Sequence, residues 1–226
     1  DLRFPLTTAI TTLEKILSSL DSTDEVNCKP ATTNYKLTEG LLDRFRGFEG
    51  SASSAYFSAY TTLFPPSLEF YNRNRRPPRD PVNAILSLCY TLIHYEMVRE
   101  IEVMGFDPTI GFYHQFDYGR ESLASDLIEP FRPQVDRFVW GIFREREFTE
   151  RDFAHDKERP GCYLKKGGRQ RFYPIYEEWA QSMRPSYVTE VRSLAKQIMD
   201  GQLDEDEKMW LSRCVAKDEL SEHDES

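Results

Sequence analysis

Residues 108–133 read PTIGFYHQFDYGRESLASDLIEPFRP, and the rest of the chain is organised around this stretch. His114 stands in an aromatic turn that also contains glycine. Asp126 and Glu129 follow at the expected start of a helix, where a spacing of three residues points both carboxylates the same way. Imidazole and carboxylates suit Mg²⁺ or Mn²⁺ better than the sulfur-rich or multi-histidine sets typical of zinc. The stretch is therefore a candidate metal site, and its alternative is a hydrogen-bonded turn histidine before a solvated helix start.

The composition is that of a globular protein. A chain of 226 residues suits one domain, or one domain with a small annex, around a sizeable core. The 39% hydrophobic and 13% aromatic content excludes a disordered chain. No apolar run reaches the roughly 18 residues of a membrane span, so we expect no membrane partner and no signal peptide. The cysteines lack paired metal-ligand spacing, which predicts reduced thiols in a cytoplasmic protein: Cys28, Cys89, Cys162 and Cys214.

Charge is unevenly distributed along the chain. The net charge of −9 argues at first against a nucleic-acid partner, but residues 203–226 carry most of it. Basic residues cluster at 72–79, where prolines stiffen the segment NRNRRPPR, and again around Gly167 and Gly168. Of these two clusters, the first suits contacts to a phosphate backbone, and an ordinary solvated loop remains its alternative. The members of the two clusters are Arg73, Arg75, Arg76 and Arg79, then Lys165, Lys166, Arg169 and Arg171.

Apolar residues recur at helical spacing through most of the chain, which predicts a mainly α fold with at most a short hairpin. Asp80 and Pro81 form a strong helix start, and Gly105 a stop. Residues 163–173 predict either a hairpin with a Gly-Gly turn or a short strand leading into a helix. The expected helices span 6–20, 37–63, 81–104, from about 122 to 129, 134–146 and 184–200, with a polar linker at 21–35 and a docked helix in the acidic end.

Glu49 stands between two glycines in GFEGSASSA at residues 47–55. Glycine costs about 1 kcal/mol in a helix relative to alanine, so the pair suggests that something lies very near this backbone. The alternative is a tight helix crossing with Glu49 exposed. Tyr56 and Tyr60 continue the face of Glu49 and would surround its carboxylate with hydroxyl groups.

Several separated motifs, taken in order, resemble one family. The chain resembles the C-terminal helical domain of the CRISPR-associated adaptation integrase over about residues 37–180. The motifs that carry this resemblance are Phe48-Glu49-Gly50 with Ala55-Tyr56-Phe57, NRRPPRDPVNA at 74–84, GFDP at 105–108, GFYH at 111–114 and DLIEPFRP at 126–133.

The resemblance implies a helical catalytic domain at 37–201, preceded by a leading helix and linker at 1–36 and followed by an acidic helix or tail at 202–226. The N-terminal β-rich domain of the family has no counterpart here, so we expect a piece of a longer or fused protein. Some relatives are joined to a reverse transcriptase. The implied partners are double-stranded DNA (protospacer and CRISPR repeat), the small adaptation partner protein and a second integrase subunit.

The resemblance also implies a reaction and its residues. The family is a metal-dependent endonuclease and integrase that inserts spacers by strand transfer, using Mg²⁺ or Mn²⁺. The alternatives are a non-catalytic helical DNA-binding or scaffold module, and a metal-dependent hydrolase outside CRISPR. Carried over by motif, the metal ligands are Glu49, His114 and Glu129, with Asp126 in support of the catalytic set. The implied DNA contacts are Arg73, Arg75, Arg76, Arg79, Arg132, Lys165, Lys166 and Arg169.

Overall fold

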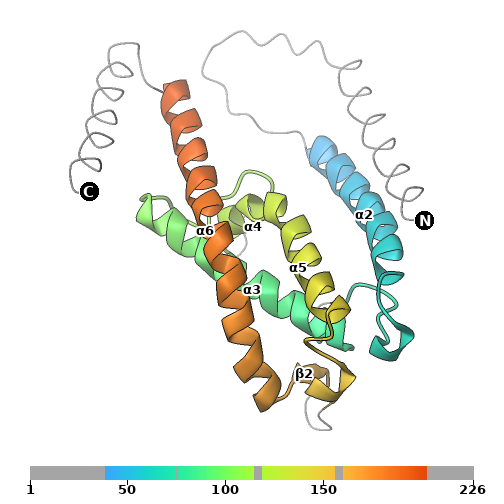
Figure 1. Cartoon of the computed structure of the whole chain (residues 1–226). Coiled ribbons are helices and arrows are strands. Elements are labelled where there is room, and N and C mark those ends of the chain that lie inside the picture. The colour runs from blue at the N-terminus through green and yellow to red at the C-terminus, as the bar shows by residue number, and fades with distance from the viewer. Residues whose placement is uncertain (1–38, 75, 115–118, 156–159, 203–226) are drawn as a thin grey trace, which may run out of the picture. The chain divides into compact units, whose positions relative to one another are not determined.

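The structure is a computed structural model that describes residues 39–74, 76–114, 119–155 and 160–202 (Figure 1). The expected helix at 6–20, the linker at 21–35, the acidic C-terminal helix and Arg75 lie outside these residues. The described part is mainly helical, as predicted, and its only sheet has two short strands. None of its helices is long and apolar enough to cross a membrane.

The described residues form two compact units, 39–91 with 131–174 and 92–130 with 175–202. Two of the three boundaries fall inside long helices, α3 (Pro81–Val103) and α6 (Lys166–Gln202), which each contribute to both units. The domain limits drawn from the sequence stay predictions.

In the first unit, α2 (Glu39–Thr61) forms where a helix was predicted and ends before Pro65 and the short helix η1 (Pro66–Leu68). Aromatic rings pack edge to face after its end. The ring of Phe64 lies 5.2 Å from that of Phe70 and 5.9 Å from that of Phe143. Large aromatic groups bury much apolar surface, so this cluster joins α2 to the rest of the unit.

The sequence predicted both ends of α3. Asp80 Oδ1 accepts the backbone N–H of Asn83 at 2.8 Å, and Pro81 is the first helical residue. Gly105 has a φ of +82°, the left-handed conformation common after helix ends.

Cys89 and Cys162 are buried free thiols, and burial raises the pKa of Cys162 to about 12.

Prolines shape the segment after the His114 turn. The helix α4 (Ser122–Leu127) is followed by η2 (Glu129–Phe131) and then α5 (Arg132–Arg144). The helix α5 begins two residues earlier than predicted because Pro133 lies in its first turn, where a missing N–H costs no hydrogen bond. The apolar face of α5 is buried as expected, and its buried residues are Val135, Val139, Ile142 and Phe143.

A small hairpin precedes the last helix. After η3 (Glu150–Asp152), β1 (Phe153–His155) pairs antiparallel with β2 (Cys162–Leu164). The alternative of a Gly-Gly hairpin turn is wrong, because Gly167 and Gly168 lie in the first turn of α6. Gly168 fits there because a Cβ at this position would lie 2.7 Å from the side chain of Leu164. The other alternative, a short strand leading into a helix, is confirmed.

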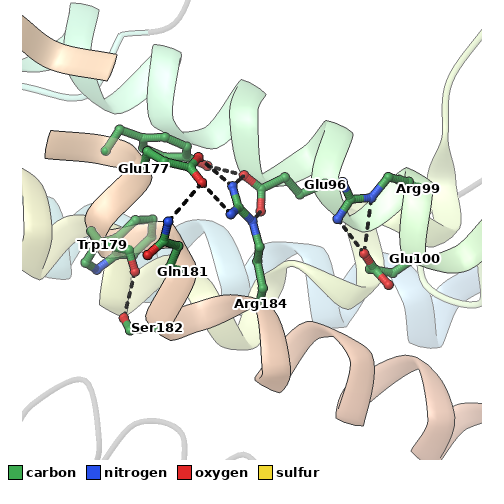
Figure 2. Close-up of polar contacts among 9 residues, drawn as sticks. Glu96, Arg99, Glu100, Glu177, Trp179, Gln181, Ser182 and Arg184 are labelled. Carbon is green, nitrogen blue, oxygen red and sulfur yellow. Dashed lines mark hydrogen bonds and ion pairs between the residues drawn. The ribbon is translucent and has the colours of Figure 1, made fainter. Parts of the chain in front are cut away.

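In the second unit an ion-pair cluster joins α3 and α6. Arg184 Nη1 donates to Glu177 Oε1 at 2.6 Å, and its Nε donates to Glu96 Oε2 at 3.1 Å. Figure 2 shows the guanidinium of Arg184 between the two carboxylates. The helix α6 is one continuous helix, so the separate helix expected at 184–200 is its second half.

Candidate functional site

The turn that carries His114 folds around one buried carboxylate in the second unit. The side chain of Asp126 is 0% exposed. Its Oδ2 accepts the backbone N–H groups of Phe112 at 2.7 Å and Tyr113 at 3.0 Å, and its Oδ1 accepts that of His114 at 2.9 Å. Three successive amides therefore converge on Asp126. The loop conformation is fixed by the last turn of α4.

The same carboxylate holds the imidazole. His114 Nδ1 lies 2.5 Å from Asp126 Oδ1, and the ring is 18% exposed. Because an ionised carboxylate can only accept, Nδ1–H is the donor and the lone pair of Nε2 remains for another partner. A carboxylate that fixes the tautomer and direction of a histidine is the usual support for a metal-binding imidazole. The bond fits both the predicted metal ligand and the alternative of a hydrogen-bonded turn histidine, so the role of His114 stays a prediction.

Glu129 begins η2, three residues after Asp126, and is half-buried. Asp126 is committed to the loop amides and to His114. Within the part of the chain that the structure describes, no group of three or more His, Cys, Asp and Glu side chains is gathered as a metal site. Glu49 belongs to the first unit, and the three-residue ligand set stays a prediction.

Glu49 is exposed on α2, as the exposed-carboxylate alternative requires. Among the described residues, no packed neighbour lies within 4 Å of a Cβ placed on Gly47 or Gly50, so the expected close approach is absent there. A hollow of about 430 Å³ opens beside Gly50 instead. Hydroxyl groups dominate its α2 side, and the lining residues are Gly50, Ser53, Ser54, Phe57, Ser58, Thr61, Tyr71, Asn72 and Arg73.

Two tyrosines on α2 serve a different carboxylate from the one expected. The hydroxyl of Tyr56 donates to Asp136 Oδ2 at 2.8 Å, and that of Tyr60 donates to the backbone carbonyl of Asp136 at 2.7 Å. The expectation that both hydroxyls surround Glu49 is therefore wrong. Sequence reasoning missed Asp136, although an acid inside the apolar face of α5 was a usable signal.

The arginine-rich loop folds over a buried amide. Asn83 is 0% exposed, and its Oδ1 accepts Arg73 Nη1 at 2.7 Å and the backbone N–H of Asn74 at 3.0 Å. Its Nδ2 donates to Asp80 Oδ2 at 2.6 Å. The side chain of Arg73 consequently turns inward, while Arg76 and Arg79 are exposed.

Arg132 also has an inner partner. Its guanidinium lies 4.9 Å from the centre of the Tyr90 ring, and that of Arg73 lies 5.6 Å from the same ring. Both contacts are cation–π interactions inside the first unit. By contrast, Lys165, Lys166 and Arg169 are exposed at the start of α6. The predicted phosphate contacts therefore divide into two inward and several outward groups.

The comparison with family models identifies the chain. The model for CRISPR associated protein Cas1 matches residues 4–178. The chain belongs to the Cas1 family. A protein of Thermodesulfovibrio yellowstonii named CRISPR-associated endonuclease Cas1 1 is 56% identical over 170 residues, which cover 75% of this chain and 54% of that protein. The chain spans about half the length of the curated Cas1 relatives it matches.

Solved structures support the same family assignment. A partial Cas6-RT-Cas1–Cas2 complex matches 88% of this chain and 58% of its own chain, with a TM-score of 0.71 and 25% identity. A casposase bound to an integration product matches 66% of this chain and 45% of its own, with a TM-score of 0.56 and 26% identity. The predicted resemblance to the adaptation integrase is thus confirmed at the level of the Cas1 family.

Proposed function

We propose that this Cas1-family chain contributes the catalytic domain of a divalent-metal-dependent DNA endonuclease and integrase, which inserts new spacers into a CRISPR array by strand transfer. Support comes from the family, from relatives named CRISPR-associated endonucleases, and from the likeness to a casposase solved with its integration product. The observation that carries the proposal is the bond between His114 and Asp126, which would leave the other imidazole nitrogen for a metal.

Glu49, His114 and Glu129 would hold the ion. Two carboxylates and one imidazole form a hard set of donors that suits Mg²⁺ or Mn²⁺. A divalent ion supplies polarisation of the scissile phosphate and a lower pKa for the attacking 3′-hydroxyl or water. The part of Asp126 would be to accept the hydrogen bond from His114 Nδ1, so that Nε2 is the ring nitrogen left to face the ion.

Exposed basic groups of the first unit would hold the DNA backbone. In the described residues of this unit basic side chains outnumber acidic ones, whereas the second unit has the reverse balance. Charged contacts to phosphate give affinity and register without base preference. The outward groups Arg76, Arg79, Lys165, Lys166 and Arg169 fit this role, and the predicted contact Arg75 belongs to the same loop.

The proposed partners follow from the relatives. A structure that contains Cas1 and Cas2 resembles this chain, which supports a small adaptation protein as a partner. Double-stranded protospacer and repeat DNA would be the substrates, and a second integrase subunit completes the expected assembly. Such substrates would place the protein in the cytoplasm.

Strand transfer of a labelled protospacer into repeat DNA, with Mn²⁺ and the small partner protein, tests the proposal. His114→Ala should reduce the rate by about 100-fold or more, because a metal ligand is lost. His94→Ala is the matched control, since His94 is an imidazole of the same unit that pairs with Glu121 at 3.3 Å and is not among the proposed ligands. Equal loss in both variants, or retained activity in His114→Ala, would contradict the proposal.

A further inference from the structure

We infer that Asp136 is a positioning residue for the proposed metal site, because it fixes the rotation of α2 and thereby the direction of Glu49. This inference rests on the proposed function, and it concerns the first unit alone. Asp136 belongs to α5 and contacts neither the proposed metal ligands nor DNA in that scheme. It acts through tyrosines on α2.

Asp136 is the centre of a buried polar network. The residue is 3% exposed, and its two carboxylate oxygens accept separate hydroxyl groups. Tyr56 donates to Oδ2 at 2.8 Å and Tyr90 donates to Oδ1 at 2.5 Å, while Tyr60 donates to the backbone carbonyl at 2.7 Å. Such a network is expensive to leave partly satisfied, so it favours one arrangement of its helices.

Helical geometry connects the two tyrosines to Glu49. Tyr56 and Tyr60 follow Glu49 by seven and eleven residues on α2. At 3.6 residues per turn, both lie within about 20° of its direction around the helix axis. A rotation of α2 that moved Glu49 aside would move both hydroxyls away from Asp136. Two bonds, one turn apart, therefore constrain rotation and sliding together.

The surroundings of Asp136 keep the tyrosine hydroxyl groups protonated, so that they can donate hydrogen bonds to it. Burial raises the pKa of Tyr56 and Tyr60, with the Asp136 charge as a further cause, so both hydroxyls keep their protons. Burial raises the pKa of Asp136, while the hydroxyls of Tyr90 and Tyr56 and the charges of Arg73 and Arg132 oppose this effect. The two arginines lie over the Tyr90 ring and balance the buried carboxylate.

Tyr90 provides an internal control for this inference. It donates to the same carboxylate as Tyr56 and is buried to a similar degree in the network, but it belongs to α3. Loss of its hydroxyl removes a buried bond of the same chemistry without releasing α2. If the network only stabilises the fold, loss of any one of the three hydroxyl groups should have the same effect on Mn²⁺ binding. If it positions Glu49, only loss of the hydroxyl groups on α2 should weaken Mn²⁺ binding.

The experiment compares Tyr56→Phe, Tyr60→Phe and Tyr90→Phe. Each variant keeps the ring and loses one hydroxyl. We expect the α2 variants to weaken Mn²⁺ binding by about tenfold, in the range seen for groups that orient metal ligands. The concentration of Mn²⁺ needed for half-maximal strand transfer should rise by the same factor, with DNA affinity unchanged. Tyr90→Phe should lower the melting temperature as much as the others and leave Mn²⁺ binding unchanged.

The outcomes separate this inference from the proposed function. If all three variants bind Mn²⁺ as tightly as the unsubstituted chain does, while Glu49→Ala does not bind it, the positioning role is overturned and the proposed metal site stands. Equal weakening by all three would also overturn it, because a general loss of stability explains that result. If the unsubstituted chain binds no Mn²⁺, the proposed function fails and the inference fails with it. The same holds if Glu49→Ala binds Mn²⁺ as tightly as the unsubstituted chain.

Discussion

Gly111 lies so close to Asp126 that a side chain cannot be accommodated between them. A Cβ at position 111 would be 2.7 Å from Asp126 Oδ2 and 2.9 Å from the backbone carbon of Ser122. Atoms this close would repel each other strongly, and the second of them belongs to the main chain. The glycine is therefore required for the next three amides to reach the Asp126 carboxylate.

Gly111→Ala should disturb the loop of His114 without unfolding the chain. Because the loop has to move away from Asp126, the imidazole loses its fixed tautomer, and strand transfer should fall by about 10- to 100-fold. Gly141→Ala is the control, since a Cβ on Gly141 in α5 meets nothing within 4 Å. That variant should keep activity and gain up to about 1 kcal/mol of stability. Similar activity of both variants would argue against a fixed loop.

Two arginines of one loop should behave differently. Arg79 is exposed, so Arg79→Ala should weaken DNA binding, reduce the salt dependence by about one phosphate contact and leave stability unchanged. Arg73 bonds to Asn83 and Asn74, so Arg73→Ala should lower the free energy of unfolding by about 2 kcal/mol. Binding titrations at several salt concentrations and urea unfolding measure these effects. A reduced salt slope with unchanged stability in Arg73→Ala would contradict the inward assignment.

The ion pairs of Arg184 predict a pH dependence of stability. Hydrogen bonds from Arg184 hold the pKa of Glu177 below its usual range. The unfolded chain therefore binds this proton at higher pH than the folded chain does. The contribution to stability is complete above the ordinary glutamate pKa and is lost as the pH falls through the lowered value.

Urea unfolding from about pH 7 to about pH 3, compared between the unsubstituted chain and Glu177→Gln, isolates this contribution from the other acids. The difference in stability between the two proteins should shrink as the pH falls through the lowered pKa of Glu177. A difference that stays constant over the range would show that Arg184 does not stabilise the ionised form.

Much of the fold could be predicted because helical periodicity and capping are local. The limits of α3 follow from Asp80, Pro81 and Gly105. Contacts between distant segments were harder. The spacing of Tyr56 and Tyr60 places them on the same face of α2. No local sequence pattern could show that Asp136, on a helix much later in the chain, would accept the hydrogen bonds of both hydroxyl groups.

The glycines illustrate the same limit. Gly167 and Gly168 suit a hairpin turn as well as the first turn of a helix, and packing against Leu164 decides between them. Similarly, Gly47 and Gly50 signalled a close approach that the described residues do not show, whereas Gly111 makes one. Sequence alone specifies where a backbone is permissive. It does not specify which segment of the fold packs against that backbone.

The most direct test of the metal site is an Mn²⁺ titration by electron paramagnetic resonance near neutral pH. The proteins to compare are the unsubstituted chain, Glu129→Ala and, as a control, Glu178→Ala, which removes an exposed glutamate from α6. The proposed site predicts saturable binding in the first and third proteins and its loss in Glu129→Ala. Indistinguishable titrations for all three would contradict Glu129 as a ligand and, with it, the ligand set on which the proposed reaction depends.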